Sequence, residues 1–341
     1  MGTIGIKDVA KLAGVSTATV SRVLSGTDAV AENTRQKVLD AAEQLGYQPN
    51  LLGRHLRCRQ TNIILIMLSS LANTFCSKVI RGIEQEAGKN GYHILICATD
   101  GVKEKEDTYL NLVRNKLADG AIILNSSLSK EQMQELSGQF PVVQCSEYID
   151  TEHTPFVSID NRAAAYDAVS YLLAHGRKKI VFFGVSNDLI SSKLRFEGYL
   201  AALSDHGIPF DKELVVYGNY GFRNATRVIP QFLRQRHPFD GIFALSDQMA
   251  AGAISVLKKS QICVPRDVSV IGFDNTEITT IMEPTITTVA QPQKLMGETA
   301  FRMLHSLLKK EKPENVILKH QLELRESTRY FPEETNAVNT K

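Results

Sequence analysis

The feature that most constrains this chain is the stretch of residues 6–24, where apolar side chains recur at helical spacing on both sides of a single glycine. One apolar face of a first short helix is formed by Ile6, Val9, Ala10 and Ala13. Gly14 follows at once, where glycine adopts a left-handed turn without steric cost. Ser16 can then cap a second helix by accepting a hydrogen bond from a free amide. This order predicts a helix-turn-helix, whose second helix lies in the DNA major groove.

The second helix of this unit has two contrasting faces. Its buried side is expected to consist of Val20, Val23 and Leu24. The opposite side carries small or hydrogen-bonding residues and one arginine, which suit contacts to base edges and phosphates. The predicted DNA-contacting residues here are Ser16, Thr17, Ala18, Ser21 and Arg22. A third helix is expected over residues 32–45, with Val38, Ala41, Ala42 and Leu45 facing inward.

The alternative interpretation is an ordinary helical hairpin with a polar outer face, because short motifs of this kind also match by chance. The local charge favours DNA. Residues 1–60 contain 8 Lys and Arg against 5 Asp and Glu, whereas the whole chain contains 39 against 37. The positive excess therefore lies where phosphates would be.

A short hinge is expected after the third helix, over residues 47–60. Pro49 ends the preceding helix, and Asn50 can cap a new helix that runs to about Arg57. About eight residues are too few for a stable isolated helix, so this one would need support from DNA or from a partner helix. Arg54 supplies positive charge and Leu56 an apolar wedge for a minor groove. A plain linker with solvated arginines remains the alternative.

Beyond residue 61, short apolar runs alternate with helical patterns in a chain of 341 residues, which is ample for two further domains. Buried strands are expected at residues 62–68, 92–98, 120–124, 141–145 and 156–159, and a second series at 178–184, 213–217, 241–244 and 268–272. Helices are expected near 76–90, 104–117, 161–175, 194–206, 225–236 and 248–259. This alternation predicts an α/β fold with two similar lobes of parallel sheets flanked by helices.

A ligand would bind in the crevice at the carboxyl ends of these strands, between the lobes. Polar and aromatic residues near those ends could hold a polyol or a nucleoside by bidentate hydrogen bonds and stacking. The candidate cleft residues are Asn73, Phe75, Arg195, Tyr220, Asp247 and Asp274. For Asp247 the alternative of a helix cap is favoured, because a helix is expected to follow it directly.

Ordered motifs spread over residues 4–330 resemble the lactose/galactose repressor family of bacterial transcription regulators. In the N-terminal part they are KDVA (7–10), AGVS (13–16), TVSRVL (19–24), LGYQPN (45–50) and Leu56. In the remainder they are RGIE (81–84), DG (119–120), IDN (159–161), RFEGY (195–199), SD (246–247), IGFDN (271–275) and TTVAQP (287–292). Within the family the chain is most similar to the cytidine-repressor branch.

The resemblance implies a homodimeric repressor that binds a pseudo-palindromic operator and an effector, which would be a nucleoside, a purine or a sugar. It implies a DNA-binding domain at residues 1–46, a hinge at 47–60 and a two-lobed core at 61–330. The chain would cross between the lobes near 160, 290 and 323, giving an N-lobe of 61–160 and 290–322 and a C-lobe of 161–289 and 323–330. It places effector binding on Arg195 and Asp274 above all.

Several classes of function lack support in the sequence. The first residues show no signal peptide, no apolar run approaches the ~20 residues that span a bilayer, and a cytoplasmic protein is expected. The five cysteines and eight histidines show no metal-ligand spacing, and neither a catalytic motif nor a cofactor motif is found. A solute-binding protein and a cleft enzyme are the alternatives to a regulator. Residues 331–341 are expected to be a disordered tail.

Overall fold

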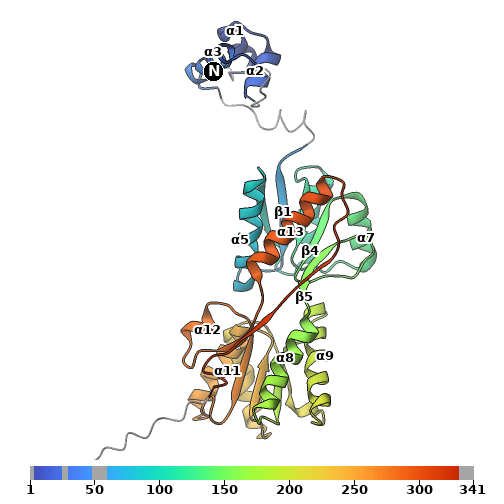
Figure 1. Ribbon diagram of the computed structural model, residues 1–341, viewed down its shortest axis with the longest axis vertical. Coiled ribbons are helices and arrows are strands. Elements are labelled where there is room, and N and C mark those ends of the chain that lie inside the picture. Colours follow the sequence, from blue (N-terminus) through green and yellow to red (C-terminus); the bar gives the residue numbers. More distant parts are fainter. Residues whose placement is uncertain (1–3, 25–29, 48–59, 330–341) are drawn as a thin grey trace, which may run out of the picture. The chain divides into compact units, whose positions relative to one another are not determined.

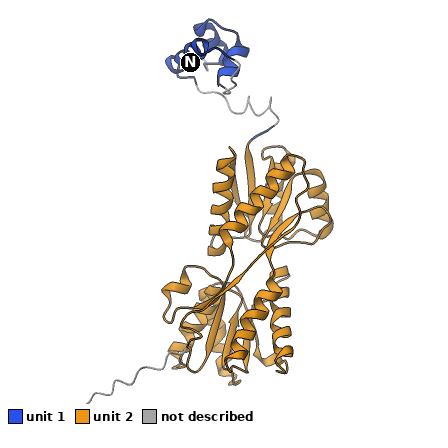
Figure 2. Cartoon of the chain, in the orientation of Figure 1, with its two compact units in different colours: residues 1–61 blue, residues 62–341 orange. Residues whose placement is uncertain are grey.

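The computed structural model describes residues 4–24, 30–47 and 60–329. The chain forms two compact units, residues 1–61 and 62–341, which are described separately (Figure 2). The predictions for Asn50, Arg54 and Leu56, for the hinge helix and for the C-terminal tail lie outside the described residues.

The smaller unit contains three short helices around one apolar cluster. They are α1 (Ile6–Ala13), α2 (Thr17–Leu24) and α3 (Glu32–Gln44). The buried cluster consists of Val9, Ala10, Val20, Val23, Val38, Ala41 and Ala42, which confirms the predicted inner faces. Gly14 ends α1 with a φ of 67°, and Ser16 Oγ accepts from the Thr19 amide at 3.1 Å, so the predicted turn and cap are both present.

The larger unit is built on two six-stranded sheets, each flanked by helices (Figure 1). The first sheet has the order β11-β5-β4-β3-β1-β2. Its strands are β1 (Ile63–Leu68), β2 (His93–Ala98), β3 (Gly120–Ile123), β4 (Val142–Cys145), β5 (Phe156–Ile159) and β11 (Val316–Leu318). The helices that belong to this lobe are α5 (Thr74–Lys89), α6 (Lys103–Arg114), α7 (Lys130–Gln139) and α13 (Gln293–Leu308).

The second sheet has the order β12-β10-β9-β8-β6-β7. Its strands are β6 (Ile180–Val185), β7 (Val215–Gly218), β8 (Gly241–Ala244), β9 (Ser269–Asp274), β10 (Thr287–Ala290) and β12 (Gln321–Glu323). Its helices are α8 (Asn161–Ala174), α9 (Ile190–Asp205), α10 (Phe222–Arg234), α11 (Asp247–Lys259) and α12 (Ile278–Ile281), with a 3-10 turn at Lys212–Leu214. Strand pairs in both sheets are parallel except that of β10 with β12.

The chain passes between the two sheets after β5, after β10 and after β11 (Figure 1). The first passage lies at residue 160. β10 ends at Ala290, so the second passage begins directly after residue 290. The third passage lies at residues 319–320, because β12 begins at Gln321 and pairs with β10.

Helices α5 and α13 pack with their backbones in unusually close contact. A Cβ atom at Gly82 would lie less than 3.0 Å from the Lys294 carbonyl oxygen, and one at Gly297 would lie equally close to the Val79 carbonyl oxygen. Real Cβ atoms do not approach backbone this closely, and backbone cannot move aside as a flexible side chain can. The two glycines therefore set the distance between the two helices.

We expect Gly297→Ala to destabilise the core by about 1–3 kcal/mol, because overpacking forces the two helices apart. Thermal unfolding of the purified protein measures the loss. Gly88→Ala in α5 is the matched control, since nothing lies within 4 Å of its added Cβ. It should be neutral or slightly stabilising, because alanine favours helix over glycine. Equal melting temperatures for Gly297→Ala and the parent would contradict the close packing.

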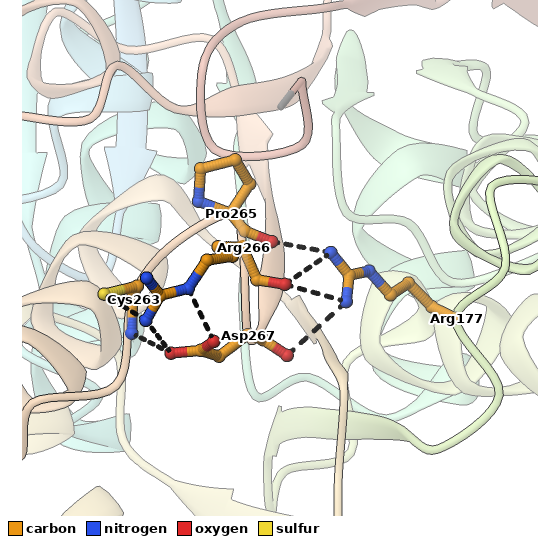
Figure 3. A network of polar contacts seen from close by, with 5 residues as sticks. All are labelled: Arg177, Cys263, Pro265, Arg266 and Asp267. Carbon is orange, nitrogen blue, oxygen red and sulfur yellow. Dashed lines mark hydrogen bonds and ion pairs between the residues drawn. The ribbon is translucent and has the colours of Figure 1, made fainter. Parts of the chain in front are cut away.

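Where β6 and β9 of the second sheet begin, Arg177 joins the loop after α8 to the loop before β9 (Figure 3). Its Nη2 donates to the Pro265 carbonyl at 2.6 Å, and its Nε donates to Ser269 Oγ at 3.0 Å. Arg266 and Asp267 form a side-chain ion pair at 3.0 Å within the same loop. These contacts fix the start of β9, the strand that ends at Asp274.

Candidate functional site

A cavity of about 860 Å³ lies where the carboxyl ends of the two sheets face each other. Its walls come from the segments that follow β1, β2, β3, β4, β6, β7, β8, β9 and β10. All six predicted cleft residues line it, namely Asn73, Phe75, Arg195, Tyr220, Asp247 and Asp274. The structure thus brings them together, and their binding of a ligand stays a prediction.

Arg195 lies on α9 and is only 5 % exposed. Its Nε donates to Asn161 Oδ1 and its Nη1 to the Leu245 carbonyl, both at 2.9 Å. The guanidinium carbon lies 3.5 Å from the centre of the Phe273 ring, a cation–π contact. Among the described residues, Nη2 of Arg195 has no hydrogen-bond partner. A fixed guanidinium with one unused donor edge on a cavity is prepared to bind an acceptor.

Asp274 ends β9 in a strained backbone conformation. Its φ is 108° and that of Asn275 is 57°, values that side-chain-bearing residues seldom adopt. Oδ1 of Asp274 accepts from Nε2 of the Gln291 side chain at 2.7 Å, and the Asp274 carbonyl accepts from the Gln293 side chain. Burial raises the pKa of the Asp274 carboxyl, against the opposing effect of Arg195. Strain held in place by hydrogen bonds beside a cavity is typical of functional sites.

Asp247 has a different position from the one expected. Ser246, not Asp247, caps α11, because Ser246 Oγ accepts from the Met249 amide at 3.3 Å. Asp247 is the first helical residue and is 1 % exposed. Its carboxylate accepts from the Thr276 amide at 2.6 Å and from Thr288 Oγ1 at 2.5 Å. Asp247 therefore holds the loop after β9 at Thr276, two residues beyond Asp274.

The two aromatic candidates differ in accessibility. Phe75 is buried in the first turn of α5, where Asn73 Oδ1 accepts from its amide at 3.1 Å. Tyr220 is 43 % exposed, and its hydroxyl lies 3.4 Å from Ser192 Oγ. Tyr220 is therefore the more accessible of the two to a ligand, whereas Phe75 contributes an apolar part of the wall.

Glu147 is a cavity residue that the sequence analysis missed. It follows β4, and its carboxylate accepts from Ser191 Oγ at 2.5 Å and from the Ser191 amide at 3.2 Å. Ser191 lies on α9 of the other lobe, so this contact joins the lobes across the cavity. Burial raises the pKa of Glu147. Its place two residues after the strand predicted at 141–145 is the signal that could have identified it.

In the smaller unit, α2 presents the face expected for DNA. Ser16, Thr17, Ala18 and Arg22 are exposed and Ser21 is half-buried, while Val20 and Val23 face the core. The exposed face is thus small and polar, and it carries one cation.

Comparisons with known proteins agree with both units. Residues 5–50 match the family model described as "Bacterial regulatory proteins, lacI family", and residues 169–328 match that of the "Periplasmic binding protein-like domain". The HTH-type transcriptional regulator RegA of Clostridium saccharobutylicum is 40% identical over 327 residues, which cover 95% of this chain and 98% of RegA. The chain belongs to the LacI family of bacterial transcriptional regulators.

The resemblance to the cytidine-repressor branch has a matching relative. The HTH-type transcriptional repressor CytR of Escherichia coli K12 is 36% identical over 300 residues, which cover 88% of each protein. The higher identity to RegA means that the match does not single out one branch. These relatives are regulators, and this chain is a transcriptional regulator with an effector-binding core, not an enzyme.

A solved structure of the lac repressor dimer, bound to operator and the anti-inducer ONPF, confirms the predicted fold class. It superposes with a TM-score of 0.86 at 26% sequence identity, covering 96% of this chain and 99% of that one. No helix in the described ranges is both long and apolar enough to cross a membrane.

We expect Asp274→Asn to stabilise the ligand-free protein increasingly as the pH rises from 5 to 8. Burial raises the pKa of Asp274 to about 7, above its ordinary value, so the folded state keeps its proton to a higher pH than the unfolded chain does. Wild-type stability therefore falls as the pH rises toward 7, and asparagine removes this loss. Asparagine also tolerates a positive φ.

Melting temperatures of both proteins across this pH range measure the effect, which should reach a few degrees. Asp267→Asn is the matched control. Arg266 and the Cys263 amide lower the pKa of Asp267 to about 2. The difference in melting temperature between Asp267→Asn and wild type should therefore be constant from pH 5 to 8 and opposite in sign. A lower melting temperature of Asp274→Asn at every pH would contradict the assignment.

Proposed function

We propose that this regulator is a repressor whose operator affinity is controlled by a nucleoside or sugar bound in the cavity between the two lobes. The observation that carries the proposal is that Arg195 and Asp274 line the same cavity. Each is fixed by its own neighbours, and each keeps one polar edge, Nη2 and Oδ2, without a partner among the described residues.

A pair of adjacent hydroxyls complements these two edges. One hydroxyl oxygen accepts from Arg195 Nη2, and a hydroxyl proton is donated to the Asp274 carboxylate. The exposed ring of Tyr220 adds a stacking surface, which favours a nucleoside over a plain sugar. CytR, a named repressor, is among the relatives, and this supports the repressor assignment.

The surface of the first lobe supports a homodimer. β2 is an edge strand, and its Leu95 and Ile96 are exposed. Further large apolar residues of this lobe are exposed at Leu71 and Leu117. Exposed apolar surface on an edge strand is a typical protein–protein contact, and a two-fold dimer would match two operator half-sites.

On the operator, Arg22, Thr17 and Ala18 would contact bases, and Ser16 and Ser21 would contact phosphates. Asn50, Arg54 and Leu56 would act at the centre of the operator, with Leu56 in the minor groove. These last three assignments rest on the sequence alone.

We expect Arg22→Ala to weaken specific operator binding by about 1–3 kcal/mol, because a bidentate base contact is lost. An operator selected from a random duplex library by the wild-type protein provides the probe for a mobility-shift titration. Lys37→Ala removes the same charge from the exposed surface of α3 and should change affinity little. If both variants lost the same affinity, for random DNA as well as for the operator, Arg22 would contribute only its charge.

We expect Asp274→Ala to abolish the effector response while leaving operator binding intact. A thermal-shift screen against nucleosides, purines and sugars supplies the effector, because a ligand that binds only the folded state stabilises it. Operator titrations with and without that effector then measure the response, and either an increase or a decrease in affinity counts. A normal response in Asp274→Ala would move the binding site elsewhere.

The solute-binding alternative predicts ligand binding without any specific DNA binding, so the operator titration excludes it or establishes it.

A further inference from the structure

The cavity walls carry more negative than positive charge. Four carboxylates line the cavity, those of Glu106, Glu147, Asp247 and Asp274. Glu106 is 2 % exposed, and its carboxylate oxygens accept from the Ser127 amide and hydroxyl at 3.0 Å. Among the described lining residues, the cations are Arg195 and Arg223, and Arg223 is exposed on the first turn of α10.

Arg195, the buried cation of the described lining, shares the cavity with the carboxylates of Asp274 and Glu147. The positive charge of Arg195 lowers the pKa of both Asp274 and Glu147, opposing the increase that burial causes. A phosphate brought beside Arg195 would add negative charge to a place where two carboxylates compete for one guanidinium. Water screens such repulsion poorly in a buried site, so it would be costly.

The helix N-termini that face the cavity offer few free amides. Free amides at helix starts are the usual phosphate-binding groups of α/β proteins. Asn73 takes up the Phe75 amide at the start of α5, and Ser246 takes up the Met249 amide at the start of α11. Asp247 in the first turn of α11 further offsets the positive end of that helix.

α6, α9 and α10 also line the cavity and begin without a side-chain cap. The Glu147 carboxylate takes up the Ser191 amide in the first turn of α9, and Glu106 in the first turn of α6 offsets the positive end of that helix. Among the described helices that line the cavity, α10 alone has neither a side-chain acceptor at its start nor an acidic first turn.

We propose that the cavity selects an uncharged ligand, a free nucleoside or a free sugar, and rejects the phosphorylated form of the same compound. This inference rests on the proposed function, because it concerns the ligand of the same cavity. The charge balance around Arg195 sets the selectivity, and Glu147 contributes to it without needing to touch the ligand.

Matched pairs of compounds test the proposal. Isothermal titration at pH 7.5 compares each nucleoside with its 5′-monophosphate and each pentose or hexose with its phosphate ester. We expect the uncharged member of the binding pair to bind at least about tenfold more tightly than its phosphorylated form. Phosphorylated members that bind equally well or better would overturn the inference.

Glu147→Gln removes one negative charge but keeps an oxygen that can accept from Ser191. We expect this variant to reduce the discrimination several-fold by improving the affinity for the phosphorylated member. Glu104→Gln, on the exposed surface of α6 and outside the cavity lining, is the matched control and should leave the ratio unchanged. If wild type, Glu147→Gln and Glu104→Gln all showed the same ratio of affinities for the uncharged and the phosphorylated compound, the role of the charge balance would be contradicted.

Arg223→Ala tests whether a phosphate binds at the start of α10 instead of beside Arg195. A phosphorylated compound that binds wild type tightly but not Arg223→Ala would place a phosphate at the start of α10, and the inference would be wrong while the proposed function stood. If no compound of either kind binds, although operator binding is normal, the proposed ligand classes themselves are wrong. The two failures are therefore distinguishable.

Discussion

A buried guanidinium is the interaction on which the cavity depends. Arg195 would be costly to bury alone, and its cost is offset by the Asn161 side chain, the Leu245 carbonyl and the face of Phe273. These three partners come from α8, from the end of β8 and from β9, so the arginine links the elements that form one wall. Because its position is fixed before any ligand arrives, little conformational entropy is lost on binding.

The second wall depends on the end of β9. Asp274 is kept in a left-handed conformation by Gln291 and Gln293, residues of the chain segment that passes from β10 to α13. Asp247 holds the same loop by hydrogen bonds from Thr276 and Thr288. A carboxylate held in this way costs stability in the empty protein. Such a cost is common where a site is prepared for a ligand.

The sequence predicted the elements with strong local signals. Alternating apolar runs identified nine of the strands, and the turn at Gly14 with the cap at Ser16 identified the smaller unit. β10, β11 and β12 were missed. β11 and β12 are only three residues long, and the pairing of all three with distant strands is not a local property. The sequence placed Asp274 and Arg195 on the cavity correctly, because both lie near predicted strand ends. It gave no sign of the contact between Glu147 and Ser191, because these residues are 44 positions apart in the chain.

The glycine contact between α5 and α13 has a mechanical consequence. Both helices begin beside the cavity, α5 after its cap Asn73 and α13 two residues after Gln291. With carbonyl oxygens seated in the notches at Gly82 and Gly297, neither helix can slide along the other without a backbone clash. Sliding of packed helices is one of the two common modes of domain closure, and rotation about short connecting segments is the other. The two helices are therefore coupled as one body, and a closure of the two lobes, if a ligand drives one, would be a rotation about the three interlobe segments.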